Sequence, residues 1–249
     1  MNVSSSKKIQ RILGAELYKL ITLPWIWRML TGTFFFNIAL AAAFTSAGLQ
    51  RTAGAQSILD IGLASMRYLQ AGFIILGILT ACSEYAGGQI RATLTAIPWR
   101  GVQLFGKLLA LAIITVPASL IIAASGVLYT FIMMRETAAV IEIDTMLTAL
   151  AGAAGYLTLT TLLSAAAGAL FRRTTPALVM LLGYYFLASP LSGNFLLSYF
   201  PDTAGYYMYM MPHPDEVHAL TPIQGTGILM LWTLCFITLA TVFYCKRDA

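Results

Sequence analysis

Residues 83–107, SEYAGGQIRATLTAIPWRGVQLFGK, form a polar, glycine-bearing stretch between two long apolar runs. Apolar residues recur within it at helical spacing, at Ile90, Leu94 and Ile97. Arg91 turns toward another face, so the pattern predicts a short amphipathic helix. Pro98 should end that helix, because a proline disfavours the α conformation of the residue before it. We therefore expect residues 83–107 to hold a short helix in the water between two membrane-spanning segments, open to a partner.

The composition on both sides of this stretch is that of a membrane protein. The 249 residues are 59% hydrophobic and only 10% charged, whereas soluble domains carry about 25% charged residues. Runs of about 20 apolar residues can cross roughly 30 Å of hydrocarbon as helices. Six such runs occur, at residues 25–47, 63–82, 104–133, 145–170, 175–191 and 227–245. The sequence predicts an all-α polytopic membrane protein whose six transmembrane helices form a single domain over residues 1–249.

The basic residues predict the orientation, because cytoplasmic loops retain Lys and Arg. With the N-terminus inside, only Arg51, Arg67 and Arg135 of the 15 basic residues fall on the outer side. The acidic residues placed outside are Asp60, Glu136, Glu142, Asp144, Asp202, Asp215 and Glu216. Both termini are therefore expected in the cytoplasm. The net charge of +5 is explained by this topology, so a nucleic-acid partner is not expected.

The N-terminal residues 1–22 are predicted to hold an amphipathic helix on the inner membrane surface. Its apolar face is formed by Ile9, Ile12, Leu13, Leu17 and Leu20. Glu16 falls in the middle of that face, where a carboxylate is costly unless it is paired. Two interpretations are open. Glu16 either pairs with Lys19 and bends out of the lipid, or it contacts residues 83–107 or a docked partner.

The predicted spans hold few polar groups at depth. Away from their ends they contain no Asp, Glu, Lys, Arg or His, and ion-coupled transporters usually need such groups within the membrane. This absence counts against a secondary transporter. Asn37 and Gln70 are expected to form hydrogen bonds between helices. In the fourth run, small residues separated by three positions predict close helix packing: Ala151 with Gly155, and Ser164 with Gly168. A substrate contact through Thr158, Thr160 or Thr161 is the weaker alternative.

Residues 192–222 are rich in aromatic residues and methionine and are interrupted by prolines. We expect short outer interfacial or re-entrant helices here, before the sixth span, with Tyr206, Tyr207 and Tyr209 in the headgroup region.

Two local patterns approach catalytic or metal motifs without completing them. Residues 101–108, GVQLFGKL, nearly match a P-loop, but that motif requires Ser or Thr after the lysine and a preceding strand. The chain is therefore not expected to hydrolyse ATP. His213 and His218, with Asp215 and Glu216 between them, lie among prolines rather than at the spacing of a helical zinc site. No metal site is expected.

Over essentially its full length the chain resembles the membrane permease subunit of type-2 ATP-binding-cassette (ABC) exporters. Three features carry the resemblance: AELYKL (residues 15–20) before the first span, SEYAGGQIRATLTAIPWRGVQLFGKLLA (residues 83–110), and the interrupted outer segment before the last span. The resemblance implies a cytoplasmic coupling helix between spans two and three, and an N-terminal interface helix that includes Glu16 and Lys19. The coupling residues that the resemblance implies are Glu84, Gly88, Pro98 and Lys107. Gly87, of the flexible glycine pair, and Arg91, a cytoplasmic charge in the same stretch, are expected to take part in coupling as well. Gln89 departs from the threonine that is commoner in the family.

The resemblance also implies partners and a mechanism. Two permease chains, identical or paralogous, would face each other in the inner membrane of a prokaryote. Each would contact a separate cytoplasmic ATPase subunit that holds ATP and Mg²⁺, with no cofactor on the permease chain. The expected activity is expulsion of a lipophilic or amphipathic compound, such as a drug or an antimicrobial peptide, as in multidrug resistance and lantibiotic immunity. Alternatives are a lipid-linked glycan exporter, an ion-coupled secondary transporter and an intramembrane hydrolase. No substrate-binding residue is predicted.

Overall fold

A computed structural model describes residues 5–50, 58–86, 100–134, 143–189, 199–210 and 220–246, and the regular structure in these ranges is entirely helical. The elements are α1 (Ser5–Thr22), α2 (Pro24–Gln50), α3 (Ile58–Leu63), α4 (Met66–Ala86), α6 (Arg100–Met133), α7 (Ile143–Phe171), α8 (Thr174–Gly183), the short π-helix η1 (Tyr184–Ala188), α10 (Pro201–Tyr206) and α11 (Pro222–Lys246).

Five of the described helices are long and apolar enough to cross a membrane. They are Pro24–Ala47, Ile58–Ser83, Gly101–Met133, Ile143–Phe171 and Pro222–Tyr244, and they correspond to five of the predicted spans. The remaining predicted span, residues 175–191, is a shorter apolar helix, Thr174–Ala188. At about 1.5 Å per residue it rises about 22 Å, which is less than the roughly 30 Å of a hydrocarbon core. The length and apolar composition of these five helices are those of a multi-pass membrane protein.

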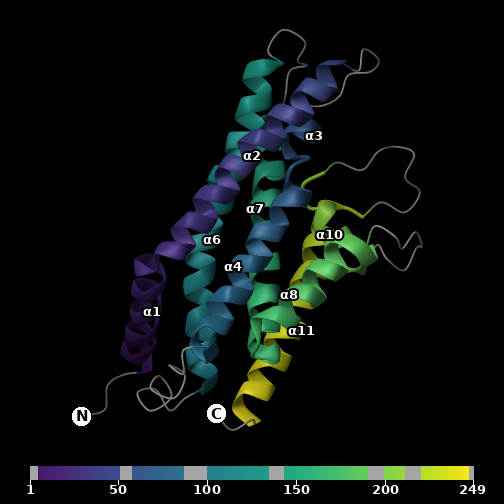
Figure 1. Cartoon of the computed structure of the whole chain (residues 1–249). Helices are drawn as coiled ribbons and strands as arrows, with labels where there is room; N and C mark the ends of the chain where they lie inside the picture. Colours follow the sequence, from purple (N-terminus) through teal and green to yellow (C-terminus); the bar gives the residue numbers. More distant parts are fainter. Residues whose placement is uncertain are drawn as a thin grey trace.

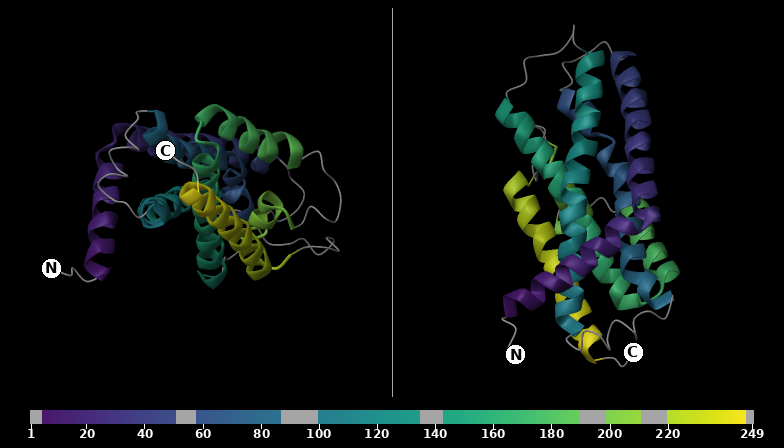
Figure 2. Two further views of the ribbon diagram at one scale, coloured as in Figure 1. Left: turned by 90° about the horizontal axis from the view of Figure 1, so that it is seen from below. Right: turned by 90° about the vertical axis from the view of Figure 1, so that its left-hand side faces the viewer.

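The long helices are grouped around α7. Helix α7 packs most extensively against α4, α11 and α6, and α2 packs against α6 (Figure 1). Helix α1 crosses the N-terminal part of α6 at an angle (Figure 2). The start of α1, the end of α4, the start of α6 and the end of α11 lie at one end of the bundle, at the bottom of Figure 1. We call it the α1 end; α3 and the end of α2 lie at the opposite end.

Polar side chains join the helices inside the bundle, as predicted for Asn37 and Gln70. The Asn37 amide on α2 donates to the carbonyl oxygen of Ile122 on α6 at 2.7 Å and accepts from the Ser65 hydroxyl at 2.7 Å. The Gln70 side-chain oxygen on α4 accepts from the hydroxyl of Tyr156 on α7. In a setting without water such bonds satisfy groups that would otherwise be costly to bury.

Small residues set the distance between α4 and α7. A Cβ placed on Gly77 of α4 would overlap the Ser164 hydroxyl and the backbone oxygen of Thr161 on α7. A Cβ placed on Gly168 of α7 would lie 3.2 Å from the Cβ of Ala81. The predicted packing role of Ser164 and Gly168 is therefore confirmed.

Gly77→Ala is expected to lower the thermal unfolding midpoint of the detergent-purified protein, because overpacking a tight contact costs about 1–3 kcal/mol. Gly32→Ala on α2 is the matched control, since nothing lies within 4 Å of its added Cβ. Equal midpoints for the two variants would contradict the packing described for α4 and α7.

Candidate functional site

Two charged side chains from the predicted site are buried where α1 meets α6. Glu16 on α1 is 5% exposed and Lys107 on α6 is 6% exposed. The helices touch beside them, because a Cβ placed on Gly106 would lie 2.9 Å from Cγ2 of Ile12. Glu16 follows Ile12 by one helical turn and Lys107 follows Gly106 directly. Opposite charges therefore lie at one helix contact, and we expect them to neutralise each other, as buried charges require.

This burial bears on the first interpretation of Glu16. Its carboxylate does not bend out, because the side chain is almost fully enclosed. A contact with Lys107, at the end of residues 83–107, stays a prediction. Lys19, the alternative partner, is half-buried on the same helix.

The two helix ends that flank residues 87–99 are held by side-chain contacts at the α1 end. Near the end of α4, Cζ of Arg172 lies over the ring of Tyr85, 5.6 Å from the ring centroid. This distance is typical of a cation–π contact. At the start of α6, the Gln103 side-chain oxygen accepts from the hydroxyl of Tyr244 on α11 at 3.1 Å. Each helix end is thus in contact with the segment after α7 or with α11.

The remaining predicted coupling residues are not part of this geometry. Gly87, Gly88, Arg91 and Pro98 lie outside the described residues, and Glu84 lies in the last turn of α4 with a side chain that is not described. Their coupling role stays a prediction.

A second cluster of polar groups surrounds Asp202 on α10 and lies nearer the opposite end. It lines a cavity of about 270 Å³, the Asp202 cavity, formed by Arg67, Tyr156, Asp202, Thr203, Tyr206, Tyr207 and Tyr209. Asp202 is only 4% exposed. Its Oδ2 accepts from the Ser189 hydroxyl and lies 3.9 Å from Nη2 of Arg67. Its Oδ1 lies 3.5 Å from the Tyr156 hydroxyl.

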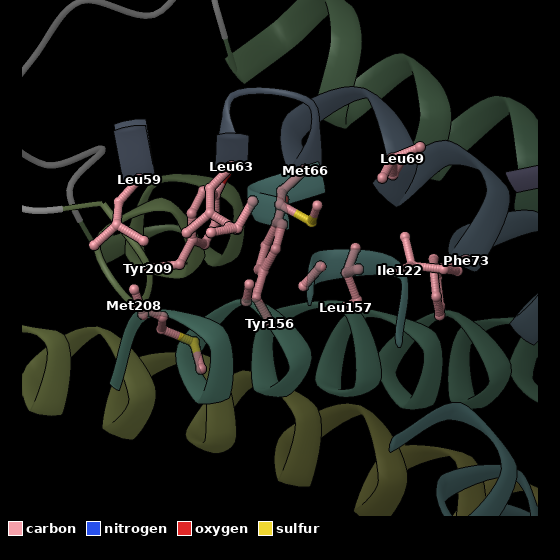
Figure 3. Packing of buried hydrophobic residues seen from close by; sticks show 14 of the residues in the cluster. Leu59, Leu63, Met66, Leu69, Phe73, Ile122, Tyr156, Leu157, Met208 and Tyr209 are labelled. Carbon is pink, nitrogen blue, oxygen red and sulfur yellow. The ribbon is translucent and has the colours of Figure 1, made fainter. Parts of the chain in front are cut away.

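This cluster adds a finding to two predictions. Asp202 is predicted on the outer side and Tyr209 in the headgroup region, and the structure shows both buried among the helices. The rings of Tyr209 and Tyr156 lie 5.4 Å apart, centroid to centroid, and Figure 3 shows both rings in the packed core with Met66 and Leu63. The reason is that α10 packs against α11 instead of lying flat on the surface. Burial, followed by the nearby Asp202 carboxylate, raises the pKa of Tyr209, which stays a neutral phenol.

An apolar groove of about 650 Å³ lies along α6, α7 and α11. Ala151, Gly152, Gly155 and Thr158 from α7 line it, together with Met208. Of the three threonines considered for a substrate contact, only Thr158 lines this groove, whereas Thr160 and Thr161 are fully buried. Gly152 and Gly155 approach Met208 closely as well, since a Cβ on Gly155 would lie 3.1 Å from Cε of Met208. Ala151 borders the open groove.

No group of three or more His, Cys, Asp or Glu side chains that could hold a metal occurs in the part of the chain that the structure describes. His213 and His218 lie outside that part.

Comparison with known proteins returns no relative. No protein-family model matches the chain, and a search of curated proteins finds no significant match.

Proposed function

We propose that the chain is the transmembrane permease subunit of an ATP-driven type-2 ABC exporter. Two such chains, identical or paralogous, would form the transport path, each with a cytoplasmic ATPase subunit that supplies ATP and Mg²⁺. ATP-driven closure of the ATPases would push on residues 87–99 and on α1. The cargo would be a lipophilic or amphipathic compound, such as a drug or an antimicrobial peptide.

The observation that carries this proposal is the buried pair of charges at the contact between α1 and α6. An amphipathic surface helix has no need to bury a carboxylate, and Glu16 is buried where α1 meets α6, the helix that follows residues 83–107 and carries the buried Lys107. A force applied to either element would then move both, because a buried ion pair is costly to separate. This is the behaviour expected of a joint between a cytoplasmic motor and membrane helices.

The arrangement of helix ends supports the proposed topology. We place the α1 end in the cytoplasm, where it would present the start of α1, the ends flanking residues 87–99 and the end of α11 to an ATPase. The short helix Thr174–Ala188 would then complete a six-pass topology. Helix α10 would be the re-entrant segment on the outer side. A lipid-linked glycan remains the alternative cargo within this class.

The orientation has a direct test in cysteine labelling. In a background without native cysteines, Thr137→Cys should react with an impermeant thiol reagent on intact cells, because the loop after α6 is placed outside. Thr174→Cys should not react, because the start of α8 and the turn before it are placed inside. The reverse labelling pattern would contradict the proposed orientation.

A second candidate function, ion-coupled secondary transport, is favoured by one observation. The buried Asp202 lies within the bundle beside the half-exposed Arg67, and buried ionisable groups are the usual carriers of ion coupling in membrane transporters. Asp202 lies in α10, outside the membrane-spanning helices, so this group adds to the few ionisable residues found at the ends of the spans.

Co-purification tests the proposed function. The tagged chain, extracted from native membranes, is expected to bring down a second protein with vanadate-sensitive ATPase activity, and a panel of amphipathic compounds should stimulate that activity. Recovery of the chain without any ATP-hydrolysing partner would favour the ion-coupled alternative.

A further inference from the structure

We propose that the Asp202 cavity binds an ammonium group, with the Asp202 carboxylate as its counter-charge and tyrosine rings as its walls. The bound molecule would be a small alkylammonium ion or the terminal amine of a larger compound. This inference does not depend on export, because it follows from the local chemistry of the cavity.

The buried charge of Asp202 is incompletely neutralised by its neighbours. Asp202 is 4% exposed, and its charged neighbour among the described residues is Arg67, at 3.9 Å. The Arg67 side chain is 48% exposed and its Nη2 lies 3.9 Å from the carboxylate, so this pair offsets only part of the cost of burying the charge. A carboxylate shielded from water but weakly paired gains free energy when a second cation enters beside it.

The walls of the Asp202 cavity are mostly aromatic. Four of the residues that line the cavity are tyrosines, namely Tyr156, Tyr206, Tyr207 and Tyr209. Aromatic faces attract ammonium groups within about 6 Å, most strongly where water is excluded. The rings are fixed by one another, since the centroids of Tyr206 and Tyr209 lie 5.8 Å apart and those of Tyr156 and Tyr209 lie 5.4 Å apart. A preformed aromatic wall reduces the entropy cost of binding.

The volume of the Asp202 cavity limits the size of its ligand. The volume of about 270 Å³ lies just below the roughly 300–1,000 Å³ typical of pockets for drug-sized ligands. The cavity therefore accommodates a small cation or one end of a larger molecule.

Arg67 has a defined part in this proposal. Its guanidinium lies near the carboxylate in the absence of ligand, so it competes with an incoming ammonium group for the same charge. An ammonium ion that enters displaces Arg67 away from the carboxylate, on the side where nearly half of its side chain is already exposed. Removing the arginine charge should then strengthen ammonium binding. If the cavity instead bound an anion or a zwitterion through Arg67, the same substitution would weaken binding.

The test is a titration of the detergent-purified full chain with ethylammonium chloride, in which saturation-transfer NMR measures binding. 1-Propanol is the uncharged probe. Asp202→Asn is expected to weaken ethylammonium binding at least tenfold, and Arg67→Gln to strengthen it several-fold. Asp144→Asn, which changes an exposed acid at the start of α7, should leave binding unchanged. The uncharged probe should bind to none of these proteins.

Two results would overturn the proposal: wild-type affinity for ethylammonium in Asp202→Asn, or weakened affinity in Arg67→Gln. If Asp202→Asn does not fold, Arg67→Gln and Tyr206→Leu decide the question. Stronger binding in the first and weaker binding in the second support an ammonium site, whereas an unchanged affinity in either variant refutes it.

Discussion

Lys107→Glu is expected to destabilise the protein severely, because it places a second carboxylate beside the buried Glu16. Breaking a buried ion pair costs about 3–5 kcal/mol, and charge reversal adds repulsion between the two groups. The double variant Glu16→Lys with Lys107→Glu restores opposite charges and should recover most of the loss. The measurement is the thermal unfolding midpoint in detergent.

Lys246→Glu provides the matched control for this charge reversal, because Lys246 is exposed at the end of α11 and its substitution should change the midpoint little. A double variant as unstable as Lys107→Glu alone would mean that the two charges do not stabilise each other. The proposed joint between α1 and α6 would then lose its basis.

Arg91→Glu and Gly88→Val are expected to reduce transport tenfold or more while leaving insertion and folding intact. The apolar helices secure insertion, whereas these two residues lie in the stretch proposed to contact the ATPase. Arg91→Glu would repel an acidic surface on that partner. Gly88→Val restricts the backbone, because a β-branched residue strongly disfavours positive φ.

The measurement for these two variants is transport per ATP hydrolysed in proteoliposomes that contain the partner ATPase. Arg173→Glu is the matched control, because it reverses an exposed arginine between α7 and α8, outside the coupling stretch. Wild-type ratios in Arg91→Glu and Gly88→Val would show that residues 83–107 transmit no force.

The positions of the long helices could be predicted because each depends on a local property, an uninterrupted apolar run. The exception, residues 175–191, shows the limit of that argument. Hydropathy alone does not determine how far a helix continues, and here Thr174–Ala188 includes a π-helical turn and is shorter than a full span. The hydrogen bonds of Asn37 and Gln70 could also be predicted from the sequence, since a polar amide at membrane depth needs a partner.

The positions of the charged side chains could not be predicted in the same way. Asp202 lies beside Pro201 in an aromatic stretch, and nothing in that local sequence distinguishes a surface turn from a helix packed against α11. Glu16 was recognised as unusual from its place on an apolar face. That Lys107 lies at the same helix contact depends on the crossing of α1 and α6, which joins parts of the chain far apart in sequence.

The most direct test of the central claim compares energy sources in proteoliposomes that contain this chain and its co-purified partner. Expulsion of an amphipathic fluorescent compound is measured with ATP alone and with an ion gradient alone. The account predicts transport that requires ATP, is stopped by vanadate and does not respond to the ion gradient. Transport that continues without ATP and follows the ion gradient would contradict it.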